Sequence, residues 1–216
     1  MPRLYDLSPT ISPRSPVWPG DTPFRSELTC RLDRGDSVNL SSFTTTPHLG
    51  SHADAPFHTE PEGAGIGDLP LLPYLGPCRV IAVPAEGRGG PPPLVEPKHL
   101  GDVDPSDPPR ILFKTNSVTD PGAFPERFTA LSPRLAEELV RAGTLLVGLD
   151  TPSVDPFTST ELNAHHTLFQ GGVANLEGLV LHHVPPGVYE LIALPLRLEG
   201  LDASPVRAVL REVDAG

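Results

Sequence analysis

The stretch T-T-T-P-H-L-G-S-H-A-D-A-P-F-H, residues 44–58, places three histidines and an aspartate within eleven positions. Imidazole nitrogens and carboxylate oxygens are ligands that zinc and its first-row neighbours accept. A histidine-rich turn can arise by chance, and for any one of these residues alone that interpretation is preferable. The set as a whole, with an acid among the histidines, predicts a metal site that includes His48, His52 and Asp54.

Proline and glycine decide the local structure of this stretch. The H-x-x-x-H spacing would place two imidazoles on one face of a helix. However, Pro47, Gly50 and Pro56 interrupt the segment and make a helix unfavourable. We therefore predict a strand that ends near Thr46, followed by a tight loop that turns the ligands toward one point. The aspartate has two oxygens and can bridge two metal ions there.

The last histidine of the stretch has a different predicted role. His58 follows Asp-Ala-Pro, where the proline restricts the backbone and can hold the imidazole near the metals without binding them. Histidine side chains transfer protons near neutral pH. The sequence therefore indicates His58 as a candidate acid or base.

Composition excludes several classes of function. The 216 residues, 38% hydrophobic and 20% charged, suit a single globular domain over residues 1–216. The formal net charge of -11 argues against a nucleic-acid partner, because phosphate binding needs clusters of basic residues. The expected partner is a small molecule.

Cysteine usage and hydropathy indicate the compartment. Cys30 and Cys78 are far apart and form no C-x-x-C pair, so neither a thiolate metal site nor a disulfide framework is predicted. The first residues contain no apolar run of signal-peptide length, and no later run approaches the ~20 residues of a membrane span. We expect a cytoplasmic protein without a membrane partner.

The single tryptophan lies upstream of the metal stretch, on a proline-stiffened loop. Trp18, held between prolines, can stack on a flat ligand with little loss of entropy. The alternative that Trp18 fills a core or a subunit interface is equally compatible with the sequence. Residues 24–32 and 38–46, which follow this loop, are predicted to be paired strands.

Helical signals occur in the second half of the chain. Ser132 can cap a helix through Ala142 that leads into a strand at residues 144–149, an alternation that predicts a mixed α/β fold. A capping box at Thr158 predicts a second helix, which carries adjacent histidines. Because neighbouring residues on a helix point in different directions, at most one of His165 and His166 should reach the metals.

Glu177 is the strongest ligand candidate far from the histidine stretch. It lies within N-L-E-G-L-V-L, in a strand predicted over residues 173–181. A charged glutamate in this apolar setting is costly to bury unless it is paired or bound to metal. The alternative is that Glu177 lies at an exposed strand end, which the surrounding leucines disfavour.

Several blocks, in order along nearly the whole chain, match a known family. The sequence resembles the bacterial kynurenine formamidases (arylformamidases) of the metal-dependent cyclase family. The resemblance rests on S-P-V-W-P-G-D-T-P (15–23), H-L-G-S-H-A-D-A-P-F-H (48–58), G-D-L-P-L-L-P-Y-L-G-P-C-R-V (67–80), D-T-P-S-V-D-P (150–156), A-H-H (164–166), L-E-G-L-V-L (176–181) and Y-E-L-I-A-L-P-L-R-L-E-G-L-D-A-S-P-V-R-A-V-L-R (189–211).

The resemblance implies a swivelling β/β/α sandwich, an α/β fold with a mixed sheet and few helices, assembled into homodimers. It also implies two Zn²⁺ per subunit, with Mn²⁺ or another divalent metal possible. The implied ligands are His48, His52, Asp54, His165 and Glu177. Asp54 would bridge the two metals. His58 would match the family's proton-transfer residue, and Trp18 the residue that contacts the substrate's aromatic ring.

The implied reaction is hydrolysis of N-formyl-L-kynurenine to L-kynurenine and formate in tryptophan degradation, by a zinc-bound hydroxide with His58 as acid and base. A serine-hydrolase route is disfavoured, because the chain contains no G-x-S-x-G motif. Two alternatives remain: a related amide or lactam hydrolase such as one that opens isatin, and a non-catalytic metal-dependent protein that binds a small ligand.

Overall fold

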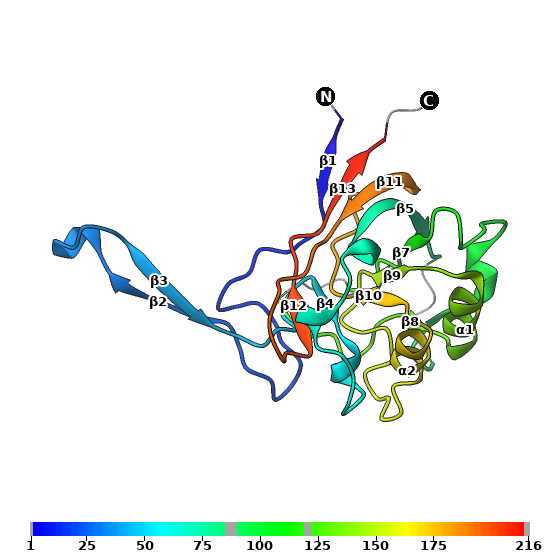
Figure 1. Cartoon of the computed structure of the whole chain (residues 1–216), viewed down its shortest axis with the longest axis horizontal. Helices are drawn as coiled ribbons and strands as arrows, with labels where there is room; N and C mark the ends of the chain where they lie inside the picture. The colour runs from blue at the N-terminus through cyan, green and yellow to red at the C-terminus, as the bar shows by residue number, and fades with distance from the viewer. Residues whose placement is uncertain (1, 85–89, 119–121, 214–216) are drawn as a thin grey trace.

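A mixed sheet forms the centre of the computed structural model, which describes residues 2–84, 90–118 and 122–213. The seven strands follow the order β1 (Leu4–Asp6), β13 (Val209–Glu212), β11 (Gly187–Ile192), β5 (Leu75–Ala82), β7 (Arg110–Lys114), β9 (Leu146–Leu149) and β10 (Ala174–Leu176). Neighbours from β1 to β5 are antiparallel. Neighbours from β5 to β10 are parallel. The first and last strands of the chain therefore lie side by side at one edge (Figure 1).

Alternating side chains give this sheet two buried faces. In β7, Ile111 and Phe113 belong to one apolar cluster, whereas Leu112 between them belongs to the other. In β9, Val147 and Leu146 are divided between the same two clusters. Successive residues of a strand point to opposite faces, so both faces of the sheet must be covered.

Two α-helices of the described chain cover one face. They are α1 (Pro133–Ala142) and α2 (Asn163–Gln170), which lie side by side at the end of the body (Figure 1). The first helix is confirmed with its predicted ends: the Ser132 hydroxyl accepts the Leu135 N–H, and Gly143 adopts the left-handed conformation that ends a helix.

The predicted start of the second helix is wrong. The capping box at Thr158 does not form, and α2 begins at Asn163, after Leu162 in a left-handed conformation. The carboxylate of Asp155 instead accepts the backbone N–H groups of Ala164 and His165. A cap from outside the helix thus replaces the predicted local one, because it satisfies the same free N–H groups.

A second, small sheet covers the other face. It consists of β4 (His52–Asp54) and β12 (Ala203–Pro205), which are antiparallel. The prediction that the histidine stretch is a loop is therefore wrong for residues 52–54. These residues form β4, which pairs with a strand some 150 residues away. The strand predicted over residues 173–181 is also shorter, since β10 ends at Leu176 and Glu177 forms an isolated bridge with His52. The β/β/α arrangement and the α/β class are confirmed.

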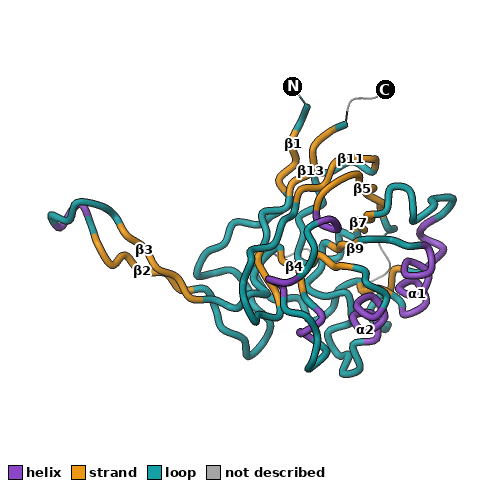
Figure 2. Tube along the Cα trace, viewed as in Figure 1, coloured by secondary structure: helices purple, strands orange, loops and turns teal. Residues whose placement is uncertain are grey.

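A long hairpin projects from this body. Its strands are β2 (Arg25–Cys30) and β3 (Leu40–Thr44), which confirm the predicted pairing (Figure 1). Figure 2 shows how much of the remaining body is loop. The other elements are short: the parallel pair β6 (Leu94–Val95) and β8 (Ala130–Leu131), and 3-10 turns at Leu32–Arg34, Pro56–His58, Ile66–Asp68, Leu72–Tyr74 and Pro97–Leu100. None of the described helices combines the length and apolar character that crossing a membrane requires.

Candidate metal centre

Five predicted ligands, from three regions of the chain, meet where the small sheet joins the end of β10. They are His48, His52, Asp54, His165 and Glu177. The donor atoms of His48, His52 and Asp54 lie within 4.8 Å of one another, and so do those of Asp54, His165 and Glu177. Asp54 is shared by both groups, as expected for a carboxylate that bridges two ions.

The donor atoms approach one another closely. The Nδ1 atom of His48 lies 2.9 Å from Asp54 Oδ1, and the Nε2 atom of His52 lies 3.5 Å from the same oxygen. Glu177 contributes one oxygen toward each side: Oε2 lies 3.4 Å from His52 Nε2, and Oε1 lies 3.2 Å from His165 Nε2. All but His48 have almost no exposed side-chain surface.

The second nitrogen of each of these imidazoles is held by an acceptor outside the cluster. The Nδ1 atom of His52 lies 3.0 Å from the Gly50 carbonyl, and Nδ1 of His165 lies 2.8 Å from Asp155. The Nε2 atom of His48 lies 2.9 Å from Asp202. Such outer acceptors fix the orientation of a metal-binding histidine and direct its other nitrogen inward.

Two atoms inside the cluster show that a cation fits there. Asp54 Oδ1 and His165 Nε2 are buried, and neither forms a hydrogen bond with any part of the chain that the structure describes. Both have oppositely charged groups within 3.5 Å, but not in hydrogen-bonding directions. A buried polar atom without a partner is unfavourable. A metal ion among these nitrogen and oxygen donors would satisfy both atoms, so the cluster is capable of binding metal.

Asn175 completes the site, although the sequence analysis did not identify it. Its side chain is fully buried, and Nδ2 donates to Asp54 Oδ2 at 2.7 Å and to Glu177 Oε1 at 3.1 Å. Its Oδ1 accepts the Asp54 backbone N–H at 3.2 Å. A single polar residue in the apolar strand β10, two positions before Glu177, was the available signal.

The charges of the cluster favour ionised carboxylates. Burial raises the pKa of Asp54, but the surrounding histidines outweigh it and hold this pKa well below its usual range. The pKa of Glu177 is also lowered, since His165 and His52 outweigh burial and the repulsion from Asp54. Burial lowers the pKa of His48, yet the neighbouring carboxylates of Asp202 and Asp54 outweigh it and raise this pKa to about 10. Both carboxylates are therefore available as anionic ligands at neutral pH.

A glycine allows the two ligand-bearing segments to approach. Gly178 adopts a φ of +64°, and a Cβ atom there would lie 2.2 Å from the Gly50 carbonyl oxygen. The Ser51 hydroxyl lies 2.9 Å from the Gly178 carbonyl and donates to it. Only glycine is compatible with this contact, which places Glu177 beside His52.

His58 lies beside the cluster and outside the two groups that share Asp54. Its ring centroid is 4.4 Å from that of His48 and 5.6 Å from that of His165. Its Nδ1 atom lies 3.3 Å from Asp202, which the sequence analysis did not single out. The side chain is 30% exposed, so a substrate can reach it.

The structure separates the two adjacent histidines of α2. The side chain of His165 faces the cluster, whereas His166 faces outward and pairs with Glu60 at 3.1 Å. Of the two adjacent histidines, only His165 belongs to the candidate cluster.

Trp18 belongs to an aromatic group. Its ring lies 5.1 Å from that of Phe124 and 5.0 Å from that of Phe157, and its side chain remains partly exposed. Phe157 stands two residues after Asp155, the residue that holds His165. The ring that Trp18 contacts, Phe157, and the residue that holds His165, Asp155, therefore belong to the same short segment of chain.

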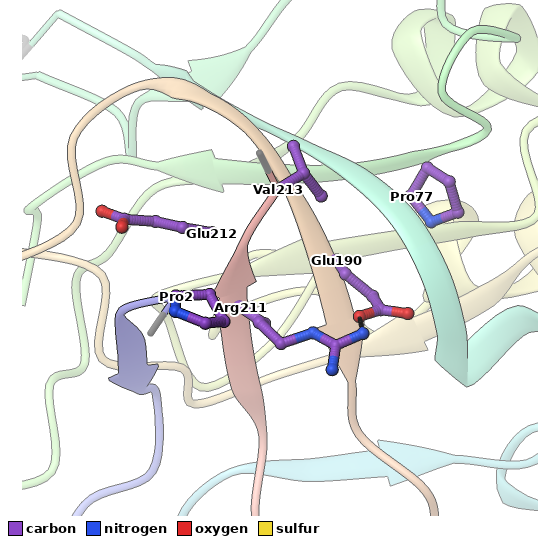
Figure 3. A pocket seen from close by; sticks show the side chains of 6 residues that line it. All are labelled: Pro2, Pro77, Glu190, Arg211, Glu212 and Val213. Atoms are coloured by element: carbon purple, nitrogen blue, oxygen red, sulfur yellow. Dashed lines mark ion pairs between the residues drawn. The ribbon is translucent and has the colours of Figure 1, made fainter. Parts of the chain in front are cut away.

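A separate surface pocket of about 440 Å³ lies near the chain termini (Figure 3). Its lining comes from Pro2, Pro77, Glu190, Arg211, Glu212 and Val213. Arg211 of β13 forms an ion pair with Glu190 of β11, so its charge is already neutralised. The pocket contains none of the predicted site residues.

Comparison with known proteins places the chain in a family. A model of the family described as putative cyclase matches residues 5–156, which is more than half of the sequence. The chain belongs to this family.

Solved structures share the whole fold. A protein described as a potential metal-dependent hydrolase with cyclase activity is 26% identical, over 99% of this chain and 100% of its own, with a TM-score of 0.82. A predicted metal-dependent hydrolase from Bacillus stearothermophilus is 26% identical over the same shares, with a TM-score of 0.80. An isatin hydrolase bound to the product analogue thioisatinate is 19% identical over 98% of this chain and 92% of its own, with a TM-score of 0.84.

Proposed function

We propose that this protein is a metal-dependent hydrolase that converts N-formyl-L-kynurenine to L-kynurenine and formate. The observation that carries the proposal is the buried cluster centred on Asp54, with a partly exposed histidine beside it. Two solved structures of the same fold, one of a potential and one of a predicted metal-dependent hydrolase, support the reaction class. The choice of substrate, and with it a place in tryptophan degradation, rests on the sequence blocks that resemble arylformamidases. A cytoplasmic location remains part of the same prediction.

We assign two zinc ions to the cluster. His48, His52 and Asp54 would hold one ion, and Asp54, His165 and Glu177 the other. When bound, zinc supplies a water of lowered pKa and polarises a carbonyl group. Asn175 keeps the two carboxylates in place by donating to both.

The remaining chemistry belongs to side chains beside the cluster. His58 has its Nδ1 atom near Asp202, which leaves Nε2 available to transfer a proton to the departing aryl amine. Trp18, together with Phe124 and Phe157, offers aromatic faces for the aryl ring of the substrate. These roles account for a formyl anilide as substrate.

We also propose that the protein is a homodimer that forms through the projecting hairpin. Register places Leu28 and Phe43 on one face of the hairpin, while Glu27 and Ser42 lie on the other. Leu28 is 50% exposed and Phe43 is 70% exposed. An isolated two-stranded hairpin is only marginally stable in water, so a second copy that covers its apolar face would stabilise it.

The test is a turnover assay with purified protein. Absorbance is followed after addition of N-formyl-L-kynurenine, with and without chelator and with zinc restored. Kynurenine formation that is lost with chelator and regained with zinc would support both the metal and the substrate. A protein that holds two metal ions per chain but leaves this substrate intact would contradict the substrate assignment. Isatin is the next compound to assay, because an isatin hydrolase shares the fold. Absence of turnover with either compound would favour a non-catalytic binding protein.

A further inference from the structure

One carboxylate contacts two functional histidines at once. Asp202 Oδ2 lies 2.9 Å from His48 Nε2 and 3.3 Å from His58 Nδ1. The first histidine belongs to the metal cluster, and the second is the proposed proton-transfer residue. No other carboxylate of the described chain contacts His58 at ion-pair distance.

The backbone holds Asp202 in this place. Its carbonyl oxygen accepts the N–H of Ala55 at 2.8 Å, and the next residue, Ala203, pairs with Asp54 in the small sheet. Both Ala203 and Ser204 are fully buried. Asp202 is therefore attached to the same strand pair that presents the ligands, and its contacts do not depend on a flexible surface loop.

The contacts define the orientation of both rings. An ionised carboxylate only accepts hydrogen bonds, so each imidazole donates an N–H to Asp202. With a metal ion held at Nδ1, His48 would keep its hydrogen on Nε2, and Nδ1 already faces the cluster, 2.9 Å from Asp54 Oδ1. His58 carries its hydrogen on Nδ1, and its Nε2 atom remains free for a substrate.

We propose that Asp202 is a positioning residue that orients the metal ligand His48 and the proton-transfer residue His58 through a single oxygen. The catalytic part of this inference rests on the hydrolase function proposed above. The parts that concern metal affinity and the tautomer of His58 do not require a substrate.

The first test measures metal binding. Wild type and Asp202→Asn are titrated with zinc in competition with a chromophoric chelator. Mutation of the outer acceptor of a metal-binding histidine lowers metal affinity by roughly 10–100-fold, and the amide is a weaker, neutral acceptor. The control variant Glu199→Gln also removes one negative charge, at an exposed position three residues earlier. It should bind zinc with the affinity of wild type. Unchanged affinity in Asp202→Asn would overturn the assignment to His48.

The second test measures the ring of His58 directly. Long-range ¹H–¹⁵N spectra of histidine-labelled, zinc-loaded protein report which nitrogen carries the hydrogen, and His58→Ala identifies the signal. We expect a single Nδ1–H tautomer in wild type and a mixture in Asp202→Asn, because a neutral amide oxygen replaces the charged acceptor that selects the tautomer. The same tautomer in both proteins would overturn the assignment to His58.

The third test uses turnover at saturating zinc. Asp202→Asn should lower kcat by roughly 10–100-fold while KM changes by less than about twofold. In a His58→Ala background the same substitution should cause no further loss of kcat, because its effect passes through His58. An equal loss in both backgrounds would overturn this route. If the assayed compound is no substrate at all, the first two tests still decide the role of Asp202.

Discussion

At the scale of single residues, the site depends on which nitrogen of each histidine faces inward. Gly50, Asp155 and Asp202 each hold one ring nitrogen of a cluster histidine from outside. The other nitrogen is then available to a metal. These outer residues matter as much as the donors, because a ring that rotates loses its ligand function.

His58 gives the first prediction at this scale. His58→Ala should lower kcat by about 100-fold or more, because it removes the proposed proton donor to the departing amine. Zinc content, measured by elemental analysis, should remain as in wild type. His58 is absent from the two buried groups that share Asp54 and belongs only to a third, more exposed group with His48 and Asp202. His182→Ala, at an exposed histidine, serves as the control. Turnover like that of wild type would remove His58 from the mechanism, and loss of zinc would make it a ligand instead.

Asn175 gives the second prediction. Asn175→Asp keeps the shape of the side chain but replaces the amide that donates to Asp54 and Glu177 with a carboxylate oxygen. We expect the free energy of unfolding of the metal-free protein to fall by about 1–3 kcal/mol, measured by urea denaturation, because both carboxylates lose a buried donor. Asn163→Asp, at the exposed start of α2, adds the same charge where the helix tolerates it. Equal stability of the two variants would contradict this role for Asn175.

At the scale of elements, sequence signals correctly predicted the helix whose cap and end residues lie next to it in the chain. Ser132 and Gly143 correctly predicted α1, because cap and stop lie within or next to the helix. The predicted start of α2 was wrong because its cap, Asp155, stands eight residues before the helix and competes with the nearer Thr158. The residues themselves indicated four of the candidate ligands, and the family resemblance chose His165 over His166. Neither indicated Asn175 or Asp202, because their contacts arise only when distant segments of the chain meet.

Gly178 gives a prediction about the join between strands. Gly178→Ala should lower the free energy of unfolding by at least about 2 kcal/mol, because a Cβ atom would add a backbone clash with Gly50 to the cost of a positive φ. Gly172→Ala is the matched control, as Gly172 also has a positive φ but no atom within 4 Å of a Cβ. Urea denaturation of both variants measures the difference. An equal loss of stability in Gly178→Ala and Gly172→Ala would mean that the contact with Gly50 has no separate effect. In that case the zinc affinity of Gly178→Ala should also equal that of wild type.

At the scale of the whole molecule, metal binding and folding should be coupled. The cluster joins the histidine stretch, α2 and the end of β10, so an ion bound there links segments that lie over 100 residues apart. At a hundredfold excess of zinc over its Kd, binding stabilises a protein by about 2.7 kcal/mol. For a chain of this length, chelation should lower Tm by roughly 5–10 °C. A Tm that does not respond to chelator or to added zinc would contradict a metal ion in the cluster.

The hairpin gives the last prediction, which concerns assembly. On its apolar face, Phe43 stacks on Phe24 but stays 70% exposed and Leu28 stays 50% exposed, whereas the opposite face carries Glu27 and Ser42. Since burying apolar side chains drives association, the double variant Leu28→Ser/Phe43→Ser should shift the protein from dimer to monomer in sedimentation velocity. Glu27→Ser changes the other face of the same hairpin and should leave the dimer intact. A double variant that still sediments as a dimer would assign the interface to another surface, and a monomeric wild type would contradict the homodimer itself.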